Sequence, residues 1–382
     1  MILSIFKRIL SKLISIIPTR DYIAFCSYPD YTDNAYAVYF YMVNNNYGKK
    51  FNFVWLVVEK NNFTQIRDII KKFHPSTKVI LKISFLGFYY YVISRYIFYT
   101  HGCWDSIKTR QHKDKMINMF HGMPLKRFGY MDNKPIGYMA NTQFTVATSA
   151  FFKKVMAESF AIPLEHVLLV GQPRNDLFFI QTDFFCDNKV NFDEYESIGI
   201  WLPTYRASTI GDIRIDGTFQ EGKISFLGEN ELDKLNEHLY ISNKLLLIKL
   251  HPMDILQNYS FKEEYSNILI IKQNALKSQL YPLLGACDYL LTDYSSVWVD
   301  FDICDKPIGF VMNDFEEYNN TRGFTMDNVV EMLPGQIMDN LEILMNFIDN
   351  PSSYKRETYN KYNLYKDGNS TERLLNELKL TL

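Results

Sequence analysis

Short apolar segments of strand length alternate with helix-like segments along nearly the whole chain. The apolar segments are bounded by turn residues and rich in branched and aromatic side chains, which is typical of buried strands. Residues 63–73 and 85–93 are two of the intervening segments with a helical pattern. Because a strand that leads through a helix to another strand makes a right-handed crossover, the alternation predicts a parallel α/β sheet. The expected strands cover residues 22–27, 51–58, 79–82, 96–100, 116–120, 144–148, 167–170, 198–202, 245–250, 268–272, 289–292 and 308–312.

The alternation loosens after residues 171–176, and residues 182–196 are polar and irregular. A chain of 382 residues also exceeds the usual size of one domain, so two domains are expected. We predict four parts: an N-terminal helix over 1–17, an N-terminal α/β domain over 18–180, a C-terminal α/β domain over 193–345, and closing helices over 346–382.

Composition excludes some classes of protein. Hydrophobic residues make up 47% of the chain and charged residues 22%, which describes a folded globular protein. The net charge of −2 lacks the basic excess of nucleic-acid-binding proteins, so no nucleic-acid partner is expected. The five cysteines are scattered without a CxxC pair, which favours reduced thiols over disulfides or a structural zinc site.

The first 17 residues form a separate segment. Apolar side chains recur at helical spacing along one stripe, and Lys7, Arg8 and Lys12 lie on the other face. An apolar stripe opposite a basic face is typical of a helix that lies in the membrane interface, here on an anionic surface. Two alternatives stay open: a signal peptide, whose apolar centre the basic residues would interrupt, and a helix packed on its own protein.

One stretch has the form of a phosphate-binding turn. Residues 289–292 read as a short buried strand, residues 293–296 break it with turn and N-cap residues, and a helix follows from Val297. Such a turn directs free backbone N–H groups and the hydroxyls of Ser295 and Ser296 toward one point at the positive end of a helix. The alternative is that the two serines only cap the helix.

Further polar residues come directly after predicted strands in both halves of the chain. In open α/β sheets, ligands bind beyond the carboxyl ends of the strands, so these clusters predict a central cleft between two Rossmann-like domains. Each cluster alone is weak evidence, because a histidine after a strand is often structural and an arginine can bridge domains. The clusters are His121 with Gly122, Arg174, Thr204 with Arg206, His251, and Asp293 to Ser296.

A series of short motifs runs in one order along the chain: Phe120–Lys126, Gly171–Asp176, Leu202–Arg206, Lys249–Pro252, Leu291–Ser296, Asp305–Pro307, Tyr318–Phe324 and Leu333–Gly335. Together these motifs resemble the CDP-glycerol glycerophosphotransferase family, the primases and polymerases of bacterial wall teichoic acid with relatives in capsule synthesis. The resemblance covers nearly the whole chain. Each motif is unspecific by itself, and the ordered combination is specific.

The resemblance implies a GT-B-like fold and a phosphotransferase that uses CDP-glycerol or CDP-ribitol as its donor. It also implies a membrane-linked teichoic acid or capsular polysaccharide acceptor, and peripheral attachment at the cytoplasmic face of the bacterial membrane. Whether glycerol or ribitol is transferred, whether the enzyme is a primase or a polymerase, and its oligomeric state stay open.

The resemblance also assigns residues. His121 and His251 match the family's essential histidines, and Ser295 and Ser296 match its donor-phosphate site. The second His–Gly pair, at residues 100–102, receives no role. The predicted site comprises His121 and His251 as catalytic residues, Thr204, Arg206, Asp293, Ser295, Ser296 and Arg322 at the donor, and Gly122, Lys126 and Arg174 as acceptor or phosphate contacts.

The implied reaction is attack of an acceptor hydroxyl on the phosphate that carries the alditol, with CMP leaving. His121 is the expected base, while His251, the serine turn and Arg322 are expected to hold the diphosphate charge. No carboxylate pair stands out as a metal site, so neither a cofactor nor an obligatory metal is expected. Two rival functions are a GT-B glycosyltransferase that uses a nucleotide sugar and a catalytically silent membrane-associated binding protein.

Overall fold

The computed structural model divides the chain into two units. Unit 1 comprises residues 1–123, 128–177 and 361–382, and unit 2 comprises residues 124–127 and 178–360. The chain therefore crosses between the units more often than the four-part division above expects, because residues 124–127 and 361–382 each belong with a distant part of the sequence. The structure describes residues 12, 14, 16–104, 115–131, 142–204, 222–251, 254, 256, 265–271, 279–322, 324–325, 329–355, 357–358 and 361–382.

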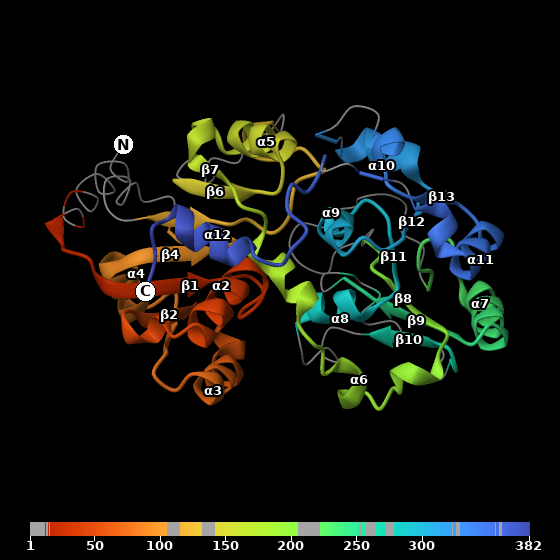
Figure 1. Ribbon diagram of the computed structural model, residues 1–382, viewed down its shortest axis with the longest axis horizontal. Coiled ribbons are helices and arrows are strands. Elements are labelled where there is room, and N and C mark those ends of the chain that lie inside the picture. Colours follow the sequence, from red (N-terminus) through yellow and green to blue (C-terminus); the bar gives the residue numbers. More distant parts are fainter. Residues whose placement is uncertain are drawn as a thin grey trace. The chain divides into compact units, whose positions relative to one another are not determined.

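Unit 1 contains a seven-stranded parallel sheet in the order β3-β2-β1-β4-β5-β6-β7 (Figure 1). The strand order changes direction between β1 and β4, which is the topological switch point where doubly wound sheets bind ligands. The strands are β1 Arg20–Cys26, β2 Asn52–Val57, β3 Lys78–Leu81, β4 Ser94–Tyr99, β5 Met116–Asn118, β6 Phe144–Ala147 and β7 Val167–Leu169.

Both faces of this sheet are buried. Alternate residues of each strand point to opposite sides, and each side packs into a core of its own. In β1, Phe25 belongs to an aromatic core with Trp55 and Tyr39, whereas Ala24 belongs to a second core with Tyr91. Helices supply the remaining apolar side chains of the two cores. They are α2 Asp33–Asn44, α3 Phe63–Phe73, α4 Phe85–Ile93, α5 Ala150–Phe160 and α12 Ser370–Glu377.

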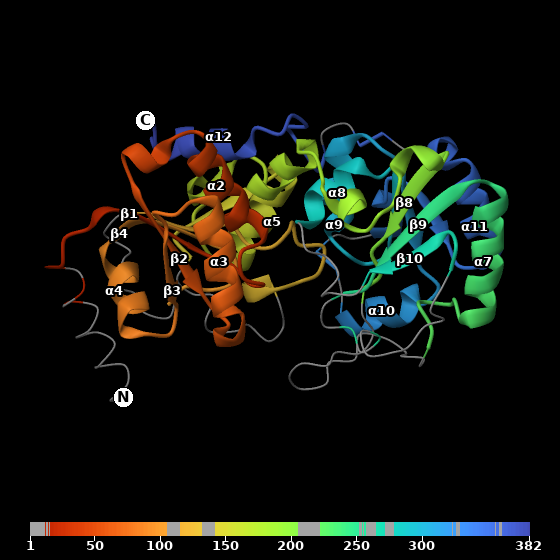
Figure 2. The same cartoon turned by 90° about the horizontal axis from the view of Figure 1, so that it is seen from below.

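Helix α12 brings the end of the chain back onto unit 1. Figures 1 and 2 show it, in blue, beside the red α2. Leu374 and Leu375 are fully buried in the aromatic core. The first turn of α12 is held by Asp176, whose carboxylate accepts the backbone N–H groups of Ser370 at 2.8 Å and Thr371 at 2.7 Å. Burial raises the pKa of Asp176 to about 6.

Unit 2 contains a six-stranded parallel sheet in the order β10-β9-β8-β11-β12-β13, with its own switch point between β8 and β11. Gly199 in β8 lies against the ring of Tyr289 in β11, and a Cβ atom there would lie 2.1 Å from that ring. The strands are β8 Ser197–Trp201, β9 Lys244–Lys249, β10 Ile268–Ile271, β11 Tyr289–Thr292, β12 Ile308–Val311 and β13 Gln336–Met338.

The helices of unit 2 cover both faces of its sheet. Figure 2 shows α7 and α11 side by side, and their apolar residues share one core with β8 and β9. Helix α9 is short, with all five of its residues buried, and it continues into a 3₁₀ turn at Asp302–Cys304. The helices are α6 Phe184–Asp187, α7 Glu229–Ile241, α8 Leu280–Ala286, α9 Val297–Phe301, α10 Phe315–Arg322 and α11 Leu341–Asp349.

The expected N-terminal helix lies almost entirely outside the described residues. Lys12, Ile14 and Ile16 are helical; Ile14 is 2% exposed and packs in the core beside Tyr91, whereas Ile16 is 77% exposed. Ile14 therefore fits the alternative of packing on the protein itself, and the membrane-interface role stays a prediction. Throughout the described ranges, no helix combines the length and hydropathy needed to cross a bilayer.

Candidate active site

The predicted base His121 follows β5 at the carboxyl edge of the unit 1 sheet. The residue before it, Phe120, has a φ of 56°, which is uncommon for a bulky residue and marks a constrained turn. Its ring stacks on Phe128 at 4.5 Å, and its N–H donates to Asn118 Oδ1 at 3.1 Å. Gly122 follows with a φ of 137°, a conformation that side chains disfavour, so the turn fixes where the imidazole projects.

A buried polar network joins this turn to the ends of β1 and β7. Asn34, at the start of α2, donates from Nδ2 to the Phe120 carbonyl at 3.0 Å and to Gln172 Oε1 at 3.1 Å. Its Oδ1 accepts the Arg174 N–H at 3.0 Å. The Arg174 guanidinium pairs with Asp33 at 3.0 Å, and both side chains are nearly buried. Arg174 is thus built into the network around His121, and its predicted contact with substrate stays a prediction.

His101, which follows β4, stacks on His121. The ring centroids lie 4.2 Å apart and the planes are inclined by 16°. His101 Nδ1 lies 3.0 Å from Thr100 Oγ1, and that hydroxyl accepts the Tyr28 N–H at 3.4 Å. The two His–Gly segments of the sequence therefore meet at the switch point of unit 1.

Both imidazoles favour the neutral form. Desolvation lowers the pKa of His121 well below its usual value, and the positive charges of His101 and Arg174 lower it further. Desolvation also lowers the pKa of His101, with Arg174 adding to the effect and Asp33 opposing it. His121 is consequently unprotonated near pH 7, which is the state that a general base requires.

In unit 2, hydrogen bonds connect the residues that follow β8 with those at the end of β11 and directly after it. Asp293 Oδ2 accepts the Thr204 N–H at 2.9 Å, and the Thr204 hydroxyl donates to the other carboxylate oxygen. The hydroxyl of Thr292 donates to the Leu202 carbonyl at 3.1 Å. These bonds hold the two loops at the switch point in one arrangement. Thr204 and Asp293 therefore shape the predicted donor site, and direct contact with a ligand stays a prediction.

Ser295 and Ser296 are half-buried in the turn between β11 and α9. Ser295 Oγ accepts the Val297 N–H at 3.4 Å, a long hydrogen bond, and Ser296 occupies the N-cap position without a side-chain capping bond. The geometry gives little support to a purely capping role for Ser296. Both hydroxyls keep hydrogen-bonding capacity, as a phosphate ligand would require.

His251 lies two residues beyond β9, in an environment of positive charge. Burial, with the charges of Lys249 and Lys126, lowers the pKa of His251 to about 4. The ring is thus neutral near pH 7 and can serve a phosphate as an N–H donor rather than as a cation. Lys249 itself is 8% exposed and reaches the Leu250 carbonyl at 3.4 Å, and burial lowers the pKa of Lys249 to about 8.

Lys249 is a candidate that the sequence patterns did not single out. A buried ammonium is costly unless an opposite charge compensates it, and no ion pair to Lys249 occurs among the residues that the structure describes. An anionic ligand would supply that charge. The available signal was the position of Lys249 directly after the apolar run Leu245–Ile248 of β9, where a buried long cation is unusual.

The predicted phosphate contact Lys126 belongs to unit 2, although its motif begins with Phe120 and His121 in unit 1. Its ammonium lies 5.0 Å from the ring centroid of Tyr318, and Tyr318 stacks on Tyr294 at 3.8 Å. Lys126 also pairs with Phe324 in an isolated antiparallel bridge. Arg322 ends α10, but its side chain lies outside the described part of the structure, as does the whole of Arg206.

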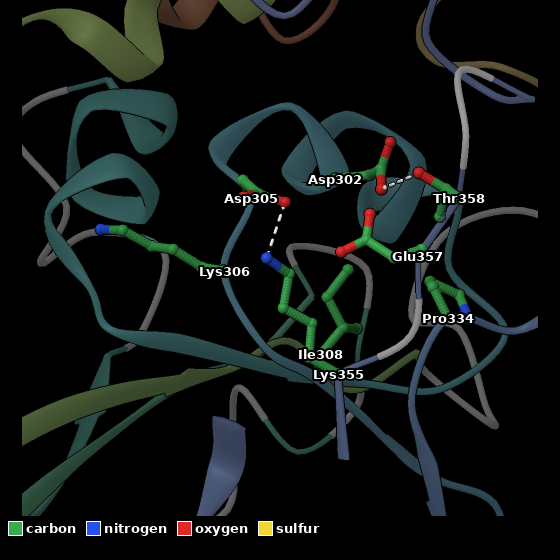
Figure 3. A pocket seen from close by; sticks show the side chains of 8 residues that line it. All are labelled: Asp302, Asp305, Lys306, Ile308, Pro334, Lys355, Glu357 and Thr358. Carbon is green, nitrogen blue, oxygen red and sulfur yellow. Dashed lines mark hydrogen bonds and ion pairs between the residues drawn. The ribbon is translucent and has the colours of Figure 1, made fainter. Parts of the chain in front are cut away.

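Carboxylates in unit 2 are directed to separate partners. Asp300 and Asp302 are separated by one residue, yet Asp300 accepts the Tyr281 hydroxyl at 2.7 Å and Asp302 accepts the Thr358 hydroxyl at 2.9 Å. Figure 3 shows a small pocket beside Asp302 in which Lys355 pairs with Asp305 at 2.7 Å. Ile308 lines the same pocket at the amino end of β12, the opposite end from the predicted site residues.

Within the described ranges, no group of three or more His, Cys, Asp or Glu residues is arranged to hold a metal ion.

Comparison with known proteins adds a family. A family model described as "CDP-Glycerol:Poly(glycerophosphate) glycerophosphotransferase" matches residues 9–380. The chain is 29% identical over 291 residues to the teichoic acid glycerol-phosphate primase of Bacillus subtilis (strain 168), covering 71% of the chain and 69% of the primase. It is 24% identical over 372 residues to the ribitol-phosphate polymerase TarL of Staphylococcus aureus (strain NCTC 8325 / PS 47), covering 92% of the chain and 61% of the polymerase.

Solved structures show the same architecture. The wall teichoic acid polymerase TagF aligns with a TM-score of 0.73 at 19% sequence identity, covering 99% of this chain and 94% of that one. The predicted GT-B-like α/β fold with two Rossmann-like units is confirmed by this match and by the two parallel sheets. The resemblance stated from the sequence motifs is confirmed by the family model.

Proposed function

This chain belongs to the CDP-glycerol:poly(glycerophosphate) glycerophosphotransferase family, and from that membership we propose that it transfers an alditol phosphate from a CDP-alditol donor to a hydroxyl of a teichoic acid acceptor. The relatives include a glycerol-phosphate primase and a ribitol-phosphate polymerase, so both CDP-glycerol and CDP-ribitol are candidate donors. The chain spans about two thirds of the length of these two relatives, at 69% and 61%.

The reaction forms one P–O bond and breaks another. The acceptor oxygen attacks the phosphorus that carries the alditol, and the bond from that phosphorus to the bridging oxygen breaks, so CMP leaves with the bridging oxygen. His121 takes the proton of the attacking hydroxyl. Because phosphoryl transfer needs positioning and charge stabilisation more than covalent catalysis, the remaining residues act on the donor's charge.

Unit 2 supplies the donor-binding groups in this proposal. The hydroxyls of Ser295 and Ser296 and the neutral ring of His251 donate hydrogen bonds to the diphosphate. Lys249 and Lys126 supply positive charge. Thr204 and Asp293 keep the two loops of the switch point in register. No step requires a bound metal ion.

The placement of His121 carries the proposal. A neutral imidazole projects from a constrained turn at the switch point of a Rossmann-like sheet, and a buried network of Asn34, Gln172 and Arg174 fixes that turn. A residue that served only to support the fold would not need a strained backbone beside the imidazole. This combination is what a positioned general base requires.

We also propose that the protein works at the membrane surface as a peripheral enzyme on the cytoplasmic face, where a lipid-linked acceptor is presented. Its support is the basic and apolar pattern of residues 1–17. A capsular polysaccharide in place of teichoic acid is a second candidate for the acceptor.

The deciding experiment incubates the purified protein with CDP-glycerol or CDP-ribitol and a lipid-linked acceptor, and measures CMP release and product length. We expect CMP from one of the two donors, and an Ala substitution at His121 as the matched inactive control. UDP or GDP release from a nucleotide sugar would instead indicate a glycosyltransferase. Tight donor binding without turnover, unchanged by the substitution, would indicate a binding protein.

A further inference from the structure

His101 has no role in the proposed reaction, yet among the described residues it makes the closest ring contact to the proposed base other than the adjoining Phe120. Its ring covers one face of His121 at 4.2 Å with nearly parallel planes. The rings of Tyr28 and His101 meet in a T-shaped contact with their centroids 5.9 Å apart. The His121 ring thus contacts both its neighbour Phe120 and a second imidazole.

The orientation of the His101 ring is set by a hydrogen bond with the hydroxyl of Thr100. Thr100 is buried, and its hydroxyl oxygen accepts the Tyr28 N–H, so its hydrogen is available for His101 Nδ1 at 3.0 Å. Donation in that direction makes Nδ1 an acceptor and places the ring proton of neutral His101 on Nε2. The backbone of Thr100 is anchored in turn, because its N–H donates to the Cys26 carbonyl at 3.2 Å.

Charged groups face this pair from several elements. Arg174 lies after β7 and Lys82 after β3, and the Lys82 ammonium donates to the Gly102 carbonyl at 2.8 Å. Asp33, at the start of α2, is the acidic group that opposes them, and it is paired with Arg174. Two stacked imidazoles in such surroundings cannot easily carry two protons, so protonation of one ring disfavours protonation of the other.

We propose that His101 is a positioning residue for His121: it stacks on the base to fix its orientation and takes the first proton that enters the pair, which keeps His121 unprotonated. The proposal deepens the proposed function, on which it rests. The proton transferred from the acceptor hydroxyl still goes to His121, and His101 touches neither donor nor acceptor. Its contribution is the geometry and the protonation state of its neighbour.

The test compares His101→Phe, which keeps a stacking ring without a proton site, with His101→Ala, which removes both. His74→Ala is the matched control, because His74 Nδ1 also bonds a threonine hydroxyl, that of Thr77 at 2.8 Å, but its ring lies tilted against Phe53 and does not contact His121. Proton NMR titration of the histidine ring signals gives the pKa of His121 in each protein. The pH profile of kcat/KM with CDP-glycerol and CDP-ribitol gives its functional counterpart.

In His101→Phe we expect the pKa of His121 to rise by about one unit, since a neighbouring proton site no longer competes. The acid limb of kcat/KM should move to higher pH by the same amount, with a plateau close to wild type. In His101→Ala the plateau should fall by about tenfold, because the base is less well oriented. His74→Ala should change neither quantity.

An unchanged His121 titration in His101→Phe would overturn the proton-sharing role, and an unchanged plateau in His101→Ala would overturn the orienting role. A folded, donor-binding His101→Phe protein with turnover lost at every pH would place His101 in contact with the reactants, which also contradicts the proposal. If wild-type protein releases CMP from neither donor, the proposed function fails, while the NMR titration still decides whether the two rings are coupled.

Discussion

Replacing Lys249 with methionine tests whether the buried charge at the end of β9 serves ligand binding at the expense of stability. The Lys249 side chain is buried, with 8% of the residue exposed. Its ammonium donates a long hydrogen bond to the Leu250 carbonyl at 3.4 Å. Burial lowers the pKa of Lys249 from 10.5 to about 8. At 1.36 kcal/mol per unit, this lowering disfavours the charged form by about 3 kcal/mol.

The sign of the pH dependence follows from proton binding. Between pH 8 and 10.5 the unfolded chain binds the Lys249 proton more strongly than the folded protein does, so the free energy of unfolding rises with pH in that interval. Below pH 8 the full penalty is present. Methionine has a similar length and no charge, so Lys249→Met should raise the free energy of unfolding by about 1–3 kcal/mol at pH 7. The gain should shrink as the pH approaches 10.5.

Thermal denaturation at pH 7 and at higher pH measures this effect, which corresponds to a rise in Tm of roughly 2–10 °C for a unit of this size. Calorimetry with CDP-glycerol and CDP-ribitol should show donor affinity reduced by about tenfold or more, which is a loss of about 1.4 kcal/mol of binding free energy or more.

Lys244→Met is the matched control. Lys244 is similarly buried on β9, but its ammonium bonds the Ile348 carbonyl at 3.0 Å and pairs with Asp349 at 3.4 Å. That variant should be destabilised. A Lys249→Met protein with a lowered Tm, or with unchanged donor affinity, would refute the reasoning.

Three further predictions concern the base, metal ions and the N-terminus. His121→Ala should lower turnover by ~10² or more, and wild-type activity should persist as the pH falls through 6.5, because the pKa of His121 is lowered; an acid limb near 6.5 would contradict this. Activity should survive EDTA, and complete loss that magnesium restores would reveal a metal requirement. A protein that begins at Lys12 keeps the buried Ile14 and should fold and bind donor, but it should lose affinity for anionic vesicles and use a membrane-embedded acceptor poorly. Equal co-sedimentation of the full-length and shortened proteins with vesicles would show that residues 1–11 do not bind membranes.

Local patterns predicted most regular elements because apolar runs and turn residues lie close together in the sequence. The strand at residues 289–292 and the helix at residues 63–73 have the predicted bounds. Four elements were missed. Helix α6 has only four residues and strand β13 only three, α10 is largely polar, and α11 falls where the predicted second domain was expected to end. For α6, α10 and β13 tertiary contacts select the conformation, and the local sequence carries little signal. Helix α11 does carry a local signal, because Asn340 caps it and Leu344, Phe347 and Ile348 lie on one helical face.

The site was predictable only in part. Strand ends in a parallel sheet share one edge, so placing His121 and Arg174 near each other required only the order of the strands. The stack of His101 on His121 required the structure, because His101 and His121 follow different strands and their ring orientation depends on Thr100 and Phe120. Lys249 lies in a recognisable motif, but its burial without an ion pair among the described residues is a property of the packed strand.

The return of residues 361–382 to unit 1 affects the order in which the protein can fold during synthesis. Leu374 and Leu375 fill the aromatic core of unit 1, and the amides of Ser370 and Thr371 satisfy the buried carboxylate of Asp176. These residues leave the ribosome only after all of unit 2 has been made. Unit 2 can therefore complete its own core first, although domains usually fold in order from the N-terminus.

Until then, the nascent unit 1 exposes the apolar surface that α12 later covers, and Asp176 lacks its backbone partners. A ribosome that stops before residue 361 would release a chain with a finished second unit and an unfinished first one. Such a product would keep the residues proposed to bind donor but would have an unstable support for His121. Chaperone dependence during translation should accordingly concentrate on the unit that is synthesised first.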